Sequence, residues 1–267
     1  MYELSINISN FKITVPTIFY DNTSLSTNDI LKSIVDTNNY LIKTTSAFNN
    51  LGFDLLSALN QRNISGTIGE IFKHFFCLNI NNYTPNPHAD GRPDILNLET
   101  SEAKEYFHSK CINIIDGRII ANKDTLTPFQ YGGVEVKCTI GGTPTKSSKL
   151  KLLRDTNFSS FDIGVPRINY TPNINWGSHH AHSLNLLGLY YDYYYIKGEY
   201  YPQILGAFFS PIEKSDWREV CRGSSNSKTT SATSLLPSGV LKMKSNCIIY
   251  IDDELYIYNF KRLKINI

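Results

Sequence analysis

A carboxylate and an ammonium group alternate on one short apolar segment of the sequence. Glu135 and Lys137 flank Val136, and glycine pairs bound the segment on both sides. Alternate side chains of a β-strand project to the same face, so we expect Glu135 and Lys137 to share one face. The apolar Val134, Val136 and Cys138 then bury the other face. A strand with only a structural use rarely holds two charges beside the core, and the pattern therefore indicates a chemical role.

A second carboxylate comes at the start of an earlier apolar segment. Asp94 follows Pro93, and proline is tolerated at the first residue of a strand or on an edge. If this strand pairs with residues 134–139, Asp94 and Glu135 meet and can share one hard cation. Mg²⁺ prefers oxygen ligands and typically uses one or two carboxylates. It would polarise a phosphate and activate a bound water. Lys137 would orient that water or, with its pKa depressed by desolvation, take its proton.

These residues resemble a known motif. Pro93-Asp94 followed by Glu135-Val136-Lys137 resembles the signature of PD-(D/E)xK nucleases, and the wider context is similar to type II restriction endonucleases. The resemblance covers about residues 63–215 and leaves both ends of the chain uncovered. Three further phrases in this stretch also look like the family: 63–66, 86–91 and 186–192.

The resemblance implies a function for the whole chain. Members hydrolyse phosphodiester bonds of double-stranded DNA at a specific site, depend on Mg²⁺ and leave 5′-phosphates. A homodimer is expected because palindromic sites match two-fold protein symmetry. The setting would be the prokaryotic cytoplasm, in a system with a cognate DNA methyltransferase that is not a physical partner.

The resemblance also assigns roles to individual residues. Asp94 and Glu135 would hold the metal, the Val136 carbonyl would be an extra ligand, and Lys137 would serve the attacking water. Many members carry an acidic residue on the helix before the first motif strand, and Glu70 occupies that place. A solvated helix face explains Glu70 equally well, because it falls opposite the apolar stripe of its helix.

The two halves of the motif are 41 residues apart, which is long for a pattern that often joins adjacent strands. Between them, Asp116-Gly117 stands between two apolar runs, 112–115 and 118–121, and predicts a β-hairpin. We expect this hairpin to be an insertion. The alternative is that the two halves match the motif by chance, as a strand-end aspartate and a separate cross-strand ion pair.

Several basic and histidine residues are candidates for DNA contacts, because such side chains bind phosphates and base edges. These are Lys146, Lys149 and Arg154 after the motif strand, His179 and His180 in the histidine cluster, and Arg222 and Lys228 in a polar loop. Mere solvation is an equally good explanation of such charges. The histidines lack the fourth ligand and the helical spacing of a zinc site.

Periodicity predicts the surrounding elements. Helical spacing covers 26–60 and then 66–80, where Ser65 is a plausible N-cap. Strands are expected at 94–98, 134–139, 184–196 and 204–212, and a second hairpin at 247–251 and 255–260 around Asp252-Asp253. Tyrosines at 190–195 favour a buried strand over a platform for stacked bases.

Together these elements predict an α/β fold with a restriction-endonuclease-like mixed central sheet flanked by helices. We expect a single domain over 1–267. Its parts would be a mainly helical segment at 1–62, a catalytic core at 63–215, and a loop and hairpin at 216–267.

Composition fits a folded chain without an extended basic surface. The 267 residues are 41% hydrophobic and 19% charged, and the net charge is +2. Any DNA must therefore be held by a local patch. The five cysteines form no CxxC pair, which disfavours a zinc knuckle or a disulfide framework. No secretory signal or membrane-length apolar run is visible, so we expect a soluble intracellular protein.

Three other functions are compatible with these residues. A nuclease of the same fold could cut DNA by its structure, as in repair or junction resolution. A DNA-binding protein could carry a silent centre, although the intact acidic pair and lysine disfavour this. A hydrolase of other substrates that uses the histidines is the weakest alternative.

Overall fold

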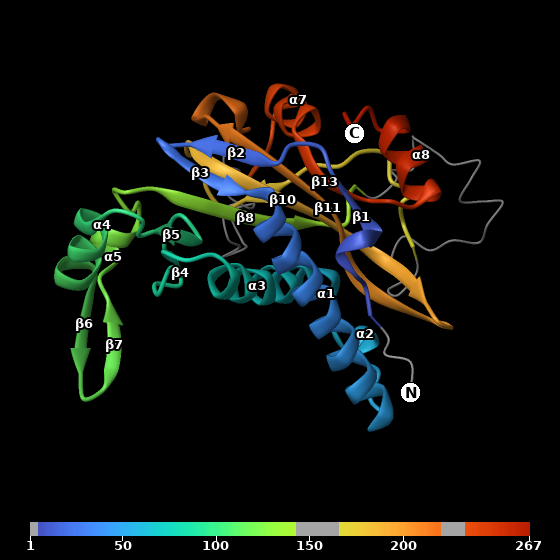
Figure 1. Cartoon of the computed structure of the whole chain (residues 1–267), viewed down its shortest axis with the longest axis horizontal. Helices are drawn as coiled ribbons and strands as arrows, with labels where there is room; N and C mark the ends of the chain where they lie inside the picture. The colour runs from blue at the N-terminus through green and yellow to red at the C-terminus, as the bar shows by residue number, and fades with distance from the viewer. Residues whose placement is uncertain (1–4, 143–165, 220–232) are drawn as a thin grey trace, which may run out of the picture.

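The computed structural model describes residues 5–142, 166–219 and 233–267, and a seven-stranded sheet lies at its centre (Figure 1). The strands follow the order β1-β13-β11-β10-β8-β5-β4. In that order they are Phe11–Ile13, Cys247–Ile251, Glu199–Ile212, Leu184–Ile196, Gly133–Thr139, Ile95–Asn97 and Tyr83–Pro85. β8 runs parallel to β10, and the other neighbouring strands of this sheet pair antiparallel.

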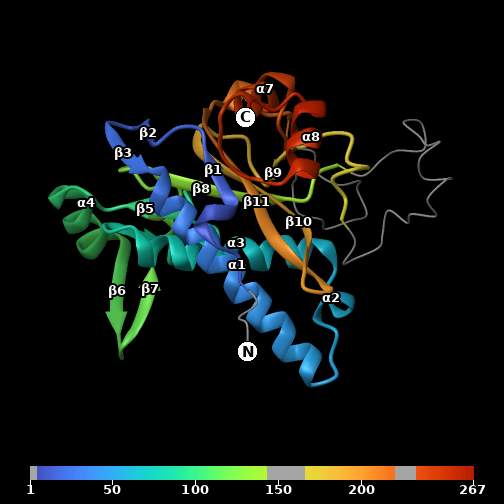
Figure 2. The ribbon, with the colours of Figure 1, turned by 45° about the vertical axis from the view of Figure 1, so that its right-hand side comes forward.

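Helices cover both sides of the sheet. In both views α1 (Thr27–Asn50) and α3 (Gln61–Asn79) lie together on one side, and α7 (Pro237–Ser245) and α8 (Glu254–Arg262) lie on the other (Figures 1 and 2). The predicted α/β class, with a mixed sheet between helices, is confirmed. Among the helices of the described residues, none combines the length and apolarity needed to cross a lipid bilayer.

α3 is the helix that faces the motif strand. Its buried residues Ile64, Ile68, Phe72 and Phe76 repeat every four residues, which gives one apolar stripe. The helix begins earlier than predicted, because the side chain of Asn60, not Ser65, accepts a hydrogen bond from a first-turn backbone N–H.

An insertion separates the two motif strands. β6 (Ile112–Ile115) and β7 (Arg118–Ala121) form the predicted hairpin, which projects from the body of the molecule (Figure 1). Asp116 and Gly117 have φ values of 52° and 74°, as a two-residue hairpin turn with right-handed strand twist requires. With α4 (Ser101–Tyr106), a π-helical turn and α5 (Lys123–Leu126), the hairpin belongs to a separate small apolar cluster. The insertion accounts for the long motif spacing.

The C-terminal prediction is wrong in one element. Residues 255–260 form most of α8 and not a second hairpin strand, because the Asp253 carboxylate accepts hydrogen bonds from the N–H groups of Leu255 and Tyr256. An aspartate that caps a helix has the same local composition as a turn aspartate. The preceding strand, β13, instead joins the central sheet between β1 and β11.

The strands expected at 184–196 and 204–212 are confirmed as β10 and β11, which form a long hairpin with its turn at Lys197-Gly198. β11 starts five residues earlier than predicted. Tyr190, Tyr191 and Tyr193 are fully buried, in agreement with a core strand.

A few short elements complete the described residues. They are η1 (Ile8–Asn10), β2 (Thr17–Tyr20), β3 (Thr23–Ser26), α2 (Leu55–Ala58), η2 (Phe107–Cys111), β9 (Gly177–Ser178), η3 (Lys214–Asp216) and β12 (Thr233–Ser234).

Candidate active site

The two motif strands are neighbours in the sheet. β5 pairs antiparallel with β8, and Ile95 lies opposite Val134. One step beyond this pair, the register brings Asp94 opposite Glu135, at the point where β5 begins. The predicted meeting of these two residues is therefore confirmed.

Lys137 joins the two carboxylates. Its Nζ lies 3.1 Å from Asp94 Oδ2 and 2.7 Å from Glu135 Oε1. The backbone N–H of Asp94 donates to Glu135 Oε2 at 3.2 Å, and the N–H of Val136 donates to Asp94 Oδ2 at 3.0 Å. The two acids are thus already arranged around one positive charge.

The backbone N–H of Val136 points toward the Asp94 carboxylate. It reaches Asp94 past the start of β5, where the partner strand no longer supplies backbone acceptors. The C=O of a strand residue points to the same side as its N–H. The Val136 carbonyl therefore faces the side on which the Asp94 carboxylate lies, as the predicted ligand role requires.

The three charged side chains differ in exposure. That of Glu135 is 2% exposed, whereas those of Asp94 and Lys137 are 22% and 24% exposed. Glu135 therefore forms the floor of the site, and the other two residues face the opening. On the other face of β8, Val134 and Val136 are buried as expected.

The opening is a cleft of about 490 Å³ between α3 and β8, bordered by the short strands β9 and β12. Asp94 and Lys137 line it together with Glu70, Lys73 and His179. α3 approaches β8 closely at Gly69, where a Cβ atom would lie 3.5 Å from Cys138 Sγ. A Cβ atom at this distance would make ordinary van der Waals contact, so the helix forms one wall of the cleft without requiring a glycine there.

Glu70 reaches the centre only through another residue. Its carboxylate is 73% exposed and lies 2.7 Å from Lys73 Nζ, which lies 3.8 Å from Asp94 Oδ1. Sequence reasoning did not select Lys73 as a site residue. Its position three residues after Glu70 on the same helical face was the signal that could have done so.

His180 lies behind the centre and not on an open surface. Its Nε2 is 3.4 Å from Glu135 Oε1, its side chain is 16% exposed, and its ring centroid is 5.0 Å from that of His182. Its buried Nδ1 has no hydrogen-bond partner among the described residues. The predicted phosphate contact therefore fits His179, which lines the cleft, better than His180.

The local charges set the protonation of the centre. Burial and the neighbouring Glu135 raise the pKa of Asp94, against the effect of Lys137. Burial also disfavours ionised Glu135, but Lys137 and His180 outweigh it and lower the pKa of Glu135 to about 2.

Lys137 is held as a cation. Burial acts to lower its pKa, but the charges of Asp94 and Glu135 outweigh this and raise it above the usual value. The predicted depression of the lysine pKa is therefore wrong, because the two acids that bring Lys137 into the site also stabilise its charged form. Lys137 acts here as a hydrogen-bond donor.

The donor set is compatible with a hard cation. Within the described ranges, no cluster of three or more histidine, cysteine, aspartate or glutamate side chains is arranged to hold a metal. Zinc sites typically need three or four such ligands. Mg²⁺ needs only one or two carboxylates, with water and other oxygens completing its shell, and Asp94, Glu135 and the Val136 carbonyl supply these.

Five predicted DNA-contact residues, Lys146, Lys149, Arg154, Arg222 and Lys228, lie outside the described residues. Comparisons with protein-family models, curated proteins and solved structures find no match to this chain. The assignment of a function therefore depends on the geometry of the site.

Proposed function

We propose that this protein is a Mg²⁺-dependent type II restriction endonuclease of the PD-(D/E)xK kind. The observation that supports this most is the convergence of Asp94, Glu135 and Lys137 on two paired strands, with one ammonium group between the two carboxylates. The mixed sheet with helices on both sides is compatible with a restriction-endonuclease-like fold.

The proposed reaction is hydrolysis of one phosphodiester bond in each DNA strand. A bound Mg²⁺ supplies the positive charge that polarises the scissile phosphate and lowers the pKa of the attacking water. The water oxygen forms a new bond to phosphorus while the bond from phosphorus to the 3′ oxygen breaks. The products are a 5′-phosphate and a 3′-hydroxyl.

Each residue of the centre has a defined part in this scheme. Asp94 and Glu135 would hold the metal, and their orientation is fixed by the hydrogen bonds from the Asp94 N–H to Glu135 and from the Val136 N–H to Asp94. Lys137 Nζ, protonated and directed into the cleft, orients the attacking water and offsets negative charge on the phosphate. Lys73 adds a second positive charge beside Asp94.

The substrate is double-stranded DNA, and we propose that two copies of the chain cut the two strands of a palindromic site. The near-neutral net charge means that contacts along the cleft, and not long-range attraction, hold the DNA. The enzyme would work in the prokaryotic cytoplasm beside a cognate methyltransferase.

Incubation with phage DNA and Mg²⁺, followed by sequencing of the fragment ends, tests the proposal. We expect discrete fragments whose ends share one sequence and carry 5′-phosphates, and no cutting in EDTA. Cutting only at branched or damaged DNA would instead support a structure-specific nuclease. Binding without cutting, at every metal concentration tried, would support a silent DNA-binding protein.

A further inference from the structure

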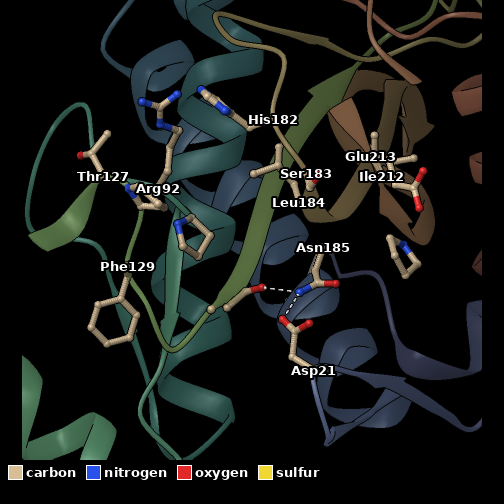
Figure 3. A pocket seen from close by; sticks show the side chains of 15 residues that line it. Asp21, Arg92, Thr127, Phe129, His182, Ser183, Leu184, Asn185, Ile212 and Glu213 are labelled. Carbon is tan, nitrogen blue, oxygen red and sulfur yellow. Dashed lines mark hydrogen bonds between the residues drawn. The ribbon is translucent and has the colours of Figure 1, made fainter. Parts of the chain in front are cut away.

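A hollow of about 450 Å³ lies beside the proposed catalytic centre (Figure 3). The residues before β5, the loop that leads into β8, the start of β10 and the end of β11 form its walls. Its volume lies in the range of about 300–1,000 Å³ in which proteins enclose small ligands. None of the residues assigned to catalysis lines it.

Three residues that line the hollow are close to residues of the centre in the sequence or in space. Pro93 lines it and directly precedes Asp94, and Gly133 lines it two residues before Glu135. His182 also lines it, and its ring lies against that of His180, which contacts Glu135. A group bound in the hollow would therefore lie next to the bond that the centre cuts.

The walls suit a flat, partly apolar ligand. Pro93, Phe129, Leu184 and Ile212 supply apolar surface. Polar groups stand at separate places, with Arg92 and His182 side by side and Asp21 and Asn185 facing each other elsewhere (Figure 3). An apolar slot with a few polar groups is the usual form of a site for a ring-shaped ligand.

The pair of Asp21 and Asn185 offers hydrogen-bond acceptors. The Nδ2 of Asn185 donates to the Asp21 carboxylate and, at 3.3 Å, to the Gly133 carbonyl. Its Oδ1 receives no hydrogen bond from the described residues, and Glu213 adds a carboxylate to the same hollow. Such acceptors favour a base that carries an exocyclic amino group, because carboxylate and amide oxygens accept from these groups.

We infer that this hollow binds one nucleobase with an exocyclic amino group, turned out of the duplex beside the bond that is cut. The inference rests on the proposed nuclease function. A stacked base shows only its edges in the grooves, so a base enters a hollow of this size by leaving the stack. Arg92 at the hollow supplies the charge that binds the phosphate of the extruded nucleotide.

Ser183→Trp tests the inference by filling the hollow. Ser183 is exposed and lines the hollow, so the larger side chain occupies it without displacing the core. Ser24→Trp is the matched control, since Ser24 is an exposed serine on β3 that does not line the hollow. Both proteins and the wild type are mixed with duplexes that carry 2-aminopurine at successive positions around the mapped cut, with Ca²⁺ replacing Mg²⁺ to hold the uncut complex.

We expect a several-fold rise in fluorescence at one position with the wild type and Ser24→Trp, and none with Ser183→Trp. Cutting by Ser183→Trp should fall at least tenfold. A mispair at the bright position should tighten binding of the wild type several-fold, because the base then costs less to unpair.

The possible failures are distinguishable. If the wild type cuts no DNA at all, the nuclease function and the base site are both rejected. If the wild type cuts its site but no position brightens, or if Ser183→Trp brightens and cuts like Ser24→Trp, the base site alone is rejected. A bright thymine position with dark neighbours would overturn the preference for an amino group.

Discussion

Two buried carboxylates on neighbouring strands behave in opposite ways. Glu135 on β8 has its pKa lowered to about 2, and Asp192 on β10 has its pKa raised to about 6. Both are almost free of solvent contact, so burial alone does not separate them. The difference lies in the partners that each carboxylate meets.

The Lys137 cation and a histidine contact Glu135, whereas Asp192 accepts hydrogen bonds from neutral groups. Lys137 and His180 contact the Glu135 carboxylate. Asp192 accepts from three backbone N–H groups and two tyrosine hydroxyls. Hydrogen bonds from neutral groups only partly offset the cost of burying a charge, whereas an adjacent cation can exceed it. Glu135 is therefore held in its ionised form, and Asp192 ties the segment at 167–168 to the core.

The largest expected effect comes from breaking the Glu135 side of this comparison. Asp94→Asn should lower the cutting rate by at least about 1,000-fold, because a charged metal ligand is lost from the reacting centre. DNA binding, measured by gel shift in Ca²⁺, should change little.

Asp90→Asn is the matched control for that variant. Asp90 precedes Asp94 by only four residues and also pairs with a lysine, Lys123, but it is exposed and lies outside the cleft. Full activity of Asp94→Asn, or equal loss in both variants, would reject the assignment of Asp94.

Lys137→Ala should reduce stability strongly when no divalent ion is present. The buried Glu135 carboxylate and the partly exposed Asp94 carboxylate then face each other without their common cation, at a cost of up to about 3–5 kcal/mol in the free energy of unfolding. Added Mg²⁺ at about 100 times its Kd should restore about 2.7 kcal/mol. Urea unfolding in EDTA and in Mg²⁺ measures both effects.

The exposed Lys123 provides the control for this measurement. Lys123→Ala breaks an exposed pair and should show neither a large loss nor a dependence on Mg²⁺. If Mg²⁺ stabilises neither the wild type nor Lys137→Ala, the carboxylates do not form a metal site.

The Asp192 side of the comparison is tested through pH. An unfolded aspartate has a pKa near 3.8 and folded Asp192 about 6, so between these values the folded state holds the extra proton. The free energy of unfolding therefore falls as pH rises through this window, by up to about 3 kcal/mol from this group. Asp192→Asn should lack this decline.

Urea titrations of the wild type and Asp192→Asn at pH 4 and pH 7 check this prediction, with the exposed Asp124→Asn as a control. From pH 4 to pH 7 the free energy of unfolding should fall less in Asp192→Asn than in the wild type. In Asp124→Asn it should fall by the same amount as in the wild type. A decline with pH in Asp192→Asn that equals the decline of the wild type would mean that Asp192 is not the titrating group.

The comparison also shows what the sequence can and cannot predict. The alternation around Val136 predicted β8, and the Asp116-Gly117 turn predicted the insertion, because both depend on local geometry. The caps at Asn60 and Asp253 were missed, since several residue types and structures share the same local composition.

Protonation was the least predictable property. One of the two roles considered for Lys137 required its pKa to fall with burial, but the pKa rises because Asp94 and Glu135 both contact it. No local pattern links His180 to Glu135, because the two residues lie 45 positions apart in the sequence. Such pairs come from tertiary packing, and only coordinates show them.

Replacing His180, which contacts Glu135, should have an intermediate effect on cutting. Because His180 contacts Glu135, a proposed metal ligand, its replacement should weaken metal affinity by about 10–100-fold if it is a positioning residue. His180→Ala should therefore need more Mg²⁺ for half-maximal cutting and approach the wild-type rate at saturating Mg²⁺. His74→Ala, an exposed histidine on α3, is the control. A lower maximal rate with an unchanged Mg²⁺ requirement would contradict a positioning role.

Glu70 gives the smallest expected effect and defines the edge of the centre. Its carboxylate is largely exposed and reaches Asp94 only through Lys73, so Glu70→Gln should lower cutting by no more than a few-fold. Lys73→Met should lower cutting more, because it removes the charge that lies beside Asp94 itself. Steady-state cutting of one defined duplex compares the two variants. A loss in Glu70→Gln that equals the loss in Asp94→Asn would show that Glu70 binds the metal directly, and the cation site would then extend onto α3.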